Sequence, residues 1–276
     1  MYSGQGAGVT RDCKGVGRDH SAPHRRIRKQ RVMPQNIYDD PVFYAAYLRL
    51  RETSTGLNDL IEQPALWSML PQDLSGMRVL DIGCGYGDFA RRARGSRASN
   101  VLGIDVSKRM LKRAKELTFD RAIEYRRMSI EEMDLGDETF DLVASSLTLH
   151  YVEDDEAALD KVARILKTGG HFVFSVEHPM CTARSEQQWI RDSSGHALYW
   201  PVDFYRPEGE RKTKWFVENV VKYHRTIETY VNGLIDAGFR LQRMAEPEPL
   251  KTSSSSLPEV ELHRRRPPLL ALAAVR

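Results

Sequence analysis

A glycine-rich turn, and a carboxylate twenty positions after Gly85 of that turn, are the residues of this sequence best suited to bind a ligand. The segment Val79–Gly87 reads VLDIGCGYG and joins an expected strand to an expected helix. Gly83 and Gly85 let the backbone turn tightly and approach a ligand without a Cβ in the way. Asp105 ends the next expected strand, where a carboxylate can accept both hydrogens of a ribose diol. The pair predicts a nucleoside-binding site.

Two further carboxylates indicate which nucleoside fits. A dinucleotide fingerprint would need its third glycine at position 88, where this chain has Asp88. A carboxylate at the start of a helix would repel a pyrophosphate bound there. Asp81, just before the glycines, is suited to hold a ligand's amino group. A ligand with a ribose, a cationic end and no phosphates therefore fits better than NAD.

The elements that must position these residues alternate between strand and helix. Aliphatic and β-branched runs predict strands at 78–82, 100–105, 123–126, 140–147 and 171–177, and helical spacings predict helices at 89–94, 108–117 and 156–166. Gly169 and Gly170 predict a turn after the last of these helices. Strands separated by helices imply parallel pairing in a sheet that is covered on both faces. The sequence predicts an α/β fold with a doubly wound, Rossmann-like sheet.

The flanking segments complete the expected domain, which covers residues 33–276. Helices are expected between Met33 and the first strand, and a later helix at 226–237 precedes strands at 239–244 and 269–275, which makes about seven strands. Residues 179–224 break the alternation and are rich in Trp and Tyr. Because long irregular segments in compact domains are usually functional, this insert is expected to be a lid or an acceptor-binding element.

Taken in order, these motifs resemble the class I S-adenosylmethionine-dependent methyltransferases, and specifically their UbiE-like small-molecule group. VLDIGCGYG resembles the first family motif, GIDVS (103–107) the second, and FDLVASSLTLHYVED (140–154) the fourth. LKTGGHFVFSVEHP (166–179) resembles the strand that follows, with Lys167 and Thr168 in place of the commoner residue-Pro pair. The resemblance is close over about 76–180 and loose over the last strands. It implies a mostly parallel sheet with an antiparallel last strand.

The resemblance implies S-adenosylmethionine as the ligand and assigns its site. Asp81, Gly83 and Gly85 would hold the methionine moiety, with Cys84 as a small residue between the glycines, and Asp105 would hold the ribose. The remaining expected contacts are Val106 and Met110 beside the adenine, Ser129 and Ile130 at its edge, Ser145 and Leu147 under the sulfonium, and Tyr38, Tyr47 and Arg51 closing over the donor. The family usually has Asp where this chain has Ser129, so a hydroxyl or a backbone carbonyl would have to replace that contact.

Three histidines are candidate general bases. Methyl transfer at a sulfonium mainly requires alignment and exclusion of water, and a base helps only an acceptor with a weakly acidic proton. His178 closes the fifth expected strand, His150 follows the fourth, and His224 follows the insert. Catalysis without a base is the alternative.

Composition limits the function classes that need to be considered. The chain has 276 residues, of which 41% are hydrophobic, and it contains no apolar run of about 18 residues. Its N-terminus lacks the apolar middle region of a secretory signal, so a cytoplasmic protein is expected. Cys13, Cys84 and Cys181 are widely spaced and form no CxxC or Cys/His group, so neither a disulfide framework nor a metal site is expected.

Charge distribution bears on the partners. Residues 1–32 hold eight Lys and Arg against two Asp, while the whole chain carries a net charge of +3. The rest of the chain is therefore slightly acidic, which disfavours a nucleic-acid partner. We expect the head to be disordered, or to reflect a start assigned too early, since Met33 follows it.

The acceptor is expected to be a small molecule. The aromatic residues of the insert suit a flat or cationic acceptor. The insert segments HP, ALYWPVD and KYHRTIETY resemble a subgroup partly tied to natural-product pathways, which implies an aromatic or indole-type intermediate. A nicotinamide-dependent oxidoreductase, an RNA methyltransferase and a non-catalytic donor-binding protein are the alternatives. The methylated atom and the oligomeric state are left open.

Overall fold

The computed structural model of the chain describes residues 35–53, 56–249 and 258–276. The expected basic head, residues 1–32, lies outside the described residues. Among the helices in the described ranges, none is long and apolar enough to cross a membrane.

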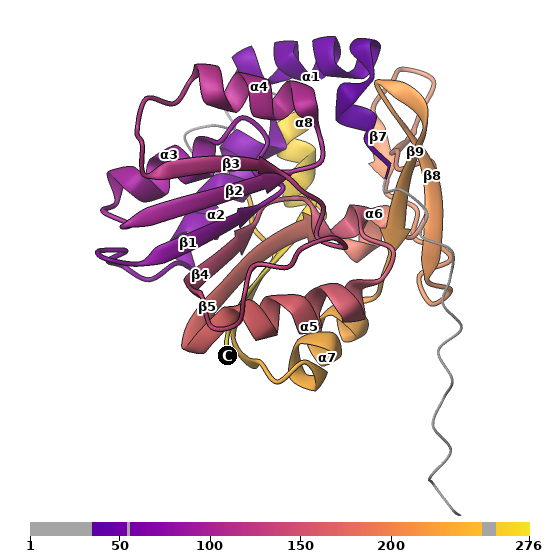
Figure 1. Cartoon of the computed structure of the whole chain (residues 1–276). Helices are drawn as coiled ribbons and strands as arrows, with labels where there is room; N and C mark the ends of the chain where they lie inside the picture. The colour runs from indigo at the N-terminus through magenta and orange to yellow at the C-terminus, as the bar shows by residue number, and fades with distance from the viewer. Residues whose placement is uncertain (1–34, 54–55, 250–257) are drawn as a thin grey trace, which may run out of the picture. The chain divides into compact units, whose positions relative to one another are not determined.

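A seven-stranded sheet organises the described chain (Figure 1), in the order β10-β11-β5-β4-β1-β2-β3. Its strands are β1 (Arg78–Ile82), β2 (Asn100–Asp105), β3 (Ile123–Arg127), β4 (Phe140–Ser145), β5 (Leu166–Glu177), β10 (Arg240–Ala245) and β11 (Leu269–Val275). β11 pairs antiparallel with both β5 and β10, and the other neighbouring pairs are parallel. The expected doubly wound sheet with an antiparallel last strand is confirmed.

The strands are apolar on both sides because each face of the sheet is covered by helices. Successive residues of a strand point to opposite faces, so Val79 joins one core cluster and Leu80 the other. One cluster packs α2 (Gln63–Ser68), α3 (Asp88–Gly95) and α4 (Lys108–Glu116) against the sheet. The other packs α5 (Asp155–Ile165) and α7 (Ile227–Asp236) against the opposite face, seen below the sheet in Figure 1.

Side-chain caps fix where the covering helices begin. Ser107 accepts a hydrogen bond from the amide of Met110 at the start of α4, and Asp154 accepts one from Ala157 at the start of α5. Each bond satisfies an amide that has no partner within its helix. Helix α4 therefore starts directly after β2, which brings its first turn next to the carboxyl end of that strand.

Two of the expected strand boundaries are wrong by more than one residue. β4 ends at Ser145 instead of position 147, because Leu147 adopts a left-handed φ of +51° that no strand accommodates. β5 begins at Leu166 instead of position 171, since Leu166 pairs with Phe140 of β4 before the register shifts. The expected glycine turn at 169–170 therefore lies within β5.

The N-terminal segment forms helices, as expected. These are η1 (Ile37–Asp39), α1 (Pro41–Thr53) and the π-helix η2 (Asn58–Glu62), which continues into α2. Asp39 accepts hydrogen bonds from the Ser107 hydroxyl at 2.6 Å and from the Arg109 amide at 3.0 Å, so η1 is tied to the start of α4.

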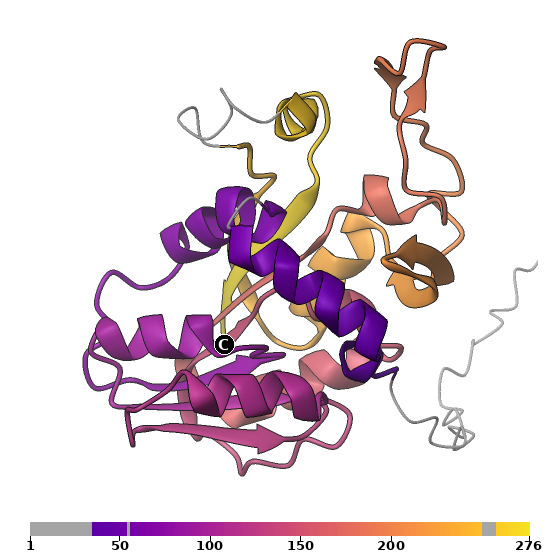
Figure 2. The same cartoon turned by 90° about the horizontal axis from the view of Figure 1, so that it is seen from above.

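The insert is more regular than the sequence indicates. It contains α6 (Pro179–Thr182), a short hairpin of β6 (Ile190–Arg191) and β7 (Ala197–Tyr199), and a longer hairpin of β8 (Gly209–Trp215) and β9 (Val217–His224). The β6-β7 hairpin reaches away from the sheet (Figure 2), whereas β9 packs against α6 and against η3 (Leu149–Tyr151). Helix α8 (Pro258–Glu261) and η5 (Leu262–Arg264) precede β11.

Phe172→Ala should lower the free energy of unfolding by about 3–5 kcal/mol, the usual cost of emptying a phenylalanine site in a packed core. The Phe172 ring is fully buried, with ring centroids 4.9 Å from Phe174 and 5.6 Å from Phe239. Phe119→Ala is the matched control, because that ring is 95% exposed and should change stability by less than about 0.5 kcal/mol. Urea denaturation measures both, and equal losses would contradict this core assignment.

Candidate functional site

The glycine-rich turn joins β1 to α3 at the carboxyl edge of the sheet. Gly83 and Gly85 have φ values of +71° and +50°, which favour glycine. The Gly83 amide donates to the Ile104 carbonyl at 2.8 Å, which ties the turn to β2. A Cβ on Gly83 would collide with the Thr148 side chain, whereas a Cβ on Gly85 would meet nothing within 4 Å. Packing of the protein thus requires Gly83, while Gly85 borders open space.

Asp105, at the end of β2, is fixed beside this turn by backbone hydrogen bonds. One carboxylate oxygen accepts from the Gly85 amide at 2.9 Å and the other from the Ser107 amide at 2.8 Å. Burial raises the pKa of Asp105 to about 6. Because each carboxylate oxygen has two lone pairs, Asp105 can still accept hydrogen bonds from a ligand's hydroxyls.

Asp81 adds a second carboxylate to the same place, and this one is buried. Its side chain is 1% exposed, and its Oδ2 atom meets no hydrogen-bond donor among the described residues. Burial, and after it the charge of Asp105, raises the pKa of Asp81 well above its usual range. A buried carboxylate without a partner is unfavourable, so a ligand that brings positive charge to Asp81 would be stabilised there. The two carboxylates fit the nucleoside with a cationic end expected from the sequence.

One cavity of about 630 Å³ holds both carboxylates and most of the other expected contacts. Its lining includes Tyr38, Tyr47, Arg51, Gly83, Cys84, Gly85, Val106, Met110, Ser129, Ile130 and Leu147. Burial raises the pKa of the Cys84 thiol well above its usual range, in keeping with a packing residue and not a nucleophile. The contacts of these residues with a ligand stay predictions.

Ser145 does not lie where the sequence places it. Its hydroxyl is fully buried and donates to the Ile82 carbonyl at 3.2 Å, so it joins β4 to β1 and does not line the cavity. Leu147 does reach the cavity, because its left-handed backbone turns the chain at the end of β4.

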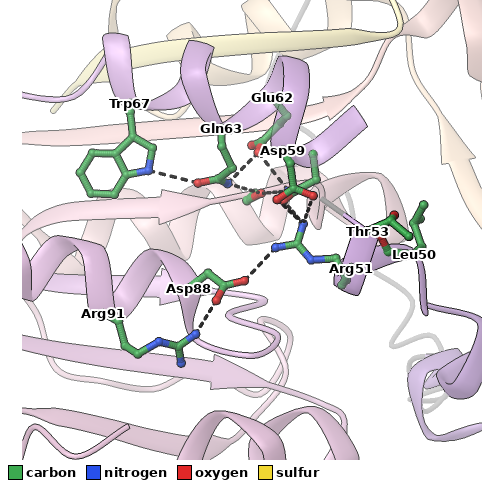
Figure 3. Close-up of polar contacts among 11 residues, drawn as sticks. Leu50, Arg51, Thr53, Asp59, Glu62, Gln63, Trp67, Asp88 and Arg91 are labelled. Carbon is green, nitrogen blue, oxygen red and sulfur yellow. Dashed lines mark hydrogen bonds and ion pairs between the residues drawn. The ribbon is translucent and has the colours of Figure 1, made fainter. Parts of the chain in front are cut away.

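Arg51 is held between two carboxylates, one of which lies on α3 just after the glycine-rich turn (Figure 3). It pairs with Asp59 of η2 at 3.2 Å and with Asp88 of α3 at 2.8 Å. Asp88 also pairs with Arg91, one turn further along α3. Arg51 thus joins α1, η2 and α3 around the glycine-rich turn, a network that the sequence did not indicate.

The structure does not bring His178 or His224 to the cavity. His178 accepts from the Met180 amide at 3.1 Å through Nδ1 and pairs with Glu246 at 2.9 Å through Nε2, which makes it the cap of α6. The two ring nitrogens of His224 contact the Thr182 hydroxyl and the Tyr205 carbonyl, each at 2.8 Å. Because both rings are fully engaged away from the cavity, the expectation of a base at either position is corrected.

His150 is the candidate histidine that lines the cavity. Its Nδ1 accepts a 3.4 Å hydrogen bond from the Glu177 amide, which places the ring proton on Nε2. Burial lowers the pKa of His150 to about 4, so the ring is neutral at pH 7.

A buried ion pair at the other end of the cavity was missed from the sequence. Lys222 of β9 is 2% exposed and lies 2.5 Å from the carboxylate of Glu177. Burial acts to raise the pKa of Glu177, but the charge of Lys222 holds this pKa at about 2. Val220, Lys222 and His224 alternate on the buried side of β9. That period of two was the available signal, because it places a lysine among inward-facing positions.

Comparisons with known proteins agree with this geometry. Residues 80–174 match a family model described as a methyltransferase domain. A solved S-adenosylmethionine-dependent methyltransferase from Mesorhizobium loti is 42% identical, with a TM-score of 0.74 over 80% of this chain and 100% of that chain. An uncharacterized protein from Haemophilus influenzae is 33% identical over 246 residues, which are 87% of this chain and 96% of that protein.

A relative with a named reaction matches over a shorter stretch. The ubiquinone biosynthesis O-methyltransferase of Alkalilimnicola ehrlichii is 39% identical over 105 residues, which are 37% of this chain and 42% of that protein. The chain therefore spans less than half of that relative's length.

Binding of S-adenosylhomocysteine, the product form of the expected donor, should weaken as pH falls through about 6. Asp105 must be ionised to accept two ribose hydroxyls, and its raised pKa puts its protonation in that window. We expect the association constant at pH 5 to be about a tenth of that at pH 7. Isothermal titration calorimetry between pH 5 and 8 measures this change.

The matched control is Asp105→Asn, which cannot ionise at this position. It should bind weakly at every pH and lose most of the pH dependence. A wild-type affinity that stays constant from pH 5 to 8 would contradict the role given to Asp105.

Proposed function

Because the chain belongs to the class I S-adenosylmethionine-dependent methyltransferases, of UbiE-like type, we propose that its acceptor is a small molecule. Membership makes the chain an enzyme that uses S-adenosylmethionine. The observation that carries the proposal is one continuous cavity whose lining includes both the glycine-rich turn and residues of the insert.

The size and lining of this cavity support a small acceptor. Its volume of about 630 Å³ falls within the range of roughly 300–1,000 Å³ that is typical of small-molecule sites. Asp81 and Asp105 line the cavity beside the glycine-rich turn, and Trp200 and Trp215 line it from the insert. Indole rings offer a flat apolar surface, which suits an acceptor with an aromatic ring. The O-methyltransferase relative, named for ubiquinone biosynthesis, is consistent with this class of acceptor.

The residues of the chain bind, align and enclose the reactants. Bound S-adenosylmethionine supplies a methyl group on an electrophilic sulfonium. Asp105 and the glycine-rich turn hold its nucleoside in place, and Asp81 offers a carboxylate to its cationic end. Tyr38 lies edge-on to Tyr47 at 5.3 Å and to Trp215 at 6.5 Å, so the N-terminal segment and the β8-β9 hairpin close together over the cavity. This closure excludes water, which methyl transfer requires.

His150 positions the acceptor in this proposal and does not act as a base. A ring with a pKa of about 4 is a weak base at pH 7, and its proton lies on Nε2. Nε2 meets no hydrogen-bond partner in the described part of the chain, so it is available to donate to the acceptor. Alignment within the closed cavity then provides the main catalytic contribution.

Methyl-labelled S-adenosylmethionine, incubated with the full chain and a cell extract, should transfer its label to molecules that pass an ultrafiltration membrane. One cavity of about 630 Å³ that reaches from the glycine-rich turn to the insert leaves room for a small acceptor. The matched control is Asp105→Ala, which should transfer little label because its ribose contact is lost. Label retained with RNA or protein, and released by ribonuclease or protease, would contradict a small-molecule acceptor.

His150→Ala should lower kcat/KM by about 3–10-fold, with most of the change in KM for the labelled acceptor, because a single neutral hydrogen bond is lost. The pH profile between 5.5 and 8.5 should keep its shape. His178→Ala is the matched control, since His178 lies outside the cavity and should affect stability more than kcat/KM. A loss of about 10²–10⁴-fold in kcat, together with a lost acidic limb of the profile, would identify His150 as a base instead.

A further inference from the structure

A buried arginine lies at the end of the cavity away from the glycine-rich turn. Arg266, between η5 and β11, lines the cavity and is 9% exposed. Its guanidinium lies 3.8 Å from the ring centroid of Trp200 and 5.7 Å from that of Trp189. Burial acts to lower the pKa of Arg266, yet a guanidinium stays charged in a folded protein. A full positive charge is therefore held inside this end of the cavity.

No carboxylate within the described ranges pairs with Arg266. Its Nη1 donates to the Cys181 sulfur at 2.9 Å and to the Pro267 carbonyl at 3.4 Å, and both of these acceptors are uncharged. Its Nε atom is buried and meets no acceptor in the described chain. The edge formed by Nε and Nη2 is the one that carboxylates and phosphates bind in a two-point fashion.

The acidic groups near Arg266 already have other partners. Glu177, whose charge reaches Arg266, is in direct contact with Lys222 and accepts a hydrogen bond from Gln187 at 3.0 Å. Glu259 also lines the cavity, but its carboxylate pairs with Arg191 at 2.9 Å and is largely exposed. The far end of the cavity therefore carries one positive charge that these side chains leave unpaired.

A second polar atom without a hydrogen-bond partner among the described residues lies on η5, close to Arg266 in the sequence. The Nδ1 atom of His263 is buried without a partner among the described residues, and His263 also lines the cavity. Burial, and then the charge of Arg266, lowers the pKa of His263 to about 4, so its ring is neutral at pH 7. Two unpartnered polar groups on one wall indicate that a ligand completes their hydrogen bonding.

We propose that Arg266 binds an oxyanion of the methyl acceptor, a carboxylate or a phosphate, so that the acceptor is a small acid. The indole of Trp200 holds the guanidinium flat, and the Nε and Nη2 edge receives the two oxygens. His263 offers a further hydrogen bond to the same group. The inference rests on the proposed function, because it names the acceptor class of that cavity.

Benzoate, phenyl phosphate and their uncharged counterpart benzamide test the proposal directly. Each is titrated into the full chain, with and without saturating S-adenosylhomocysteine, and its binding is measured by ligand-observed NMR. At least one of the two oxyanions should bind wild type about tenfold or more tightly than benzamide, and the better of the two identifies a carboxylate or a phosphate acceptor. Equal binding of all three compounds, or no oxyanion binding at all, would overturn the proposal.

Arg266→Met and Arg266→Gln should both abolish the preference for oxyanions and leave the affinity for S-adenosylhomocysteine within about twofold of wild type. The matched control is Arg265→Met, because Arg265 is exposed, stacks on Trp189 at 4.8 Å and does not line the cavity. If either Arg266 variant keeps the preference for oxyanions, or if Arg265→Met loses it, the assignment of the anion site to Arg266 is wrong. Arg266→Gln decides the matter if Arg266→Met does not fold.

The same titrations separate this inference from the proposed function. Wild type that fails to bind S-adenosylhomocysteine, yet prefers oxyanions through Arg266, would overturn the function and keep the anion site. Wild type that binds S-adenosylhomocysteine and labels a small neutral acceptor would keep the function and overturn the anion site.

Discussion

The two carboxylates near the ends of β1 and β2, Asp81 and Asp105, are the constraint around which the rest of the site is built. Asp105 is held by the Gly85 and Ser107 amides, which fixes the glycine-rich turn and the start of α4 with one side chain. Asp81 has a buried oxygen without a donor in the described chain. Such groups are costly in a folded protein unless a ligand compensates them. The fold keeps them because the carboxyl ends of parallel strands deliver both to one crevice.

The cavity is electrically polarised from one end to the other. Acidic groups gather at the glycine-rich turn, whereas Arg266 leaves a positive charge at the insert end, where Glu177 and Lys222 pair with each other. Charges on buried side chains such as Arg266 act more strongly than exposed ones because less solvent screens them. A donor with a cationic end would therefore be attracted to the carboxylates at the glycine-rich turn. An acceptor with an anionic group would be attracted to Arg266.

The sequence predicts the parts of the site that lie next to the ends of strands. It does not predict the parts that come together from segments far apart along the chain. Gly83, Gly85 and Asp105 lie at fixed offsets from strand ends, so the pattern of strands and helices is enough to place them together. Lys222 and Arg266 reach the cavity from a hairpin and from the chain's last segment, and no local pattern relates them. His178 was assigned to chemistry from its position after a strand, but Glu246, 68 positions away, engages its ring. Long-range hydrogen bonds of this kind decide whether a histidine is available, and they cannot be inferred from local sequence.

Residues 35–39 of the N-terminal segment contact both the start of α4 and the β8-β9 hairpin. Asp39 accepts a hydrogen bond from the Arg109 amide in the first turn of α4, the helix that follows Asp105 of β2. Gln35 accepts a hydrogen bond from the Val221 amide of β9 at 3.0 Å. Between them Tyr38 contacts the indole of Trp215, which in turn lies 5.5 Å from the ammonium of Lys222. The start of α4 and the insert are therefore both in contact with one short stretch of chain. An enzyme that must exclude water from both reactants at once gains from this arrangement, because the same segment closes over donor and acceptor together.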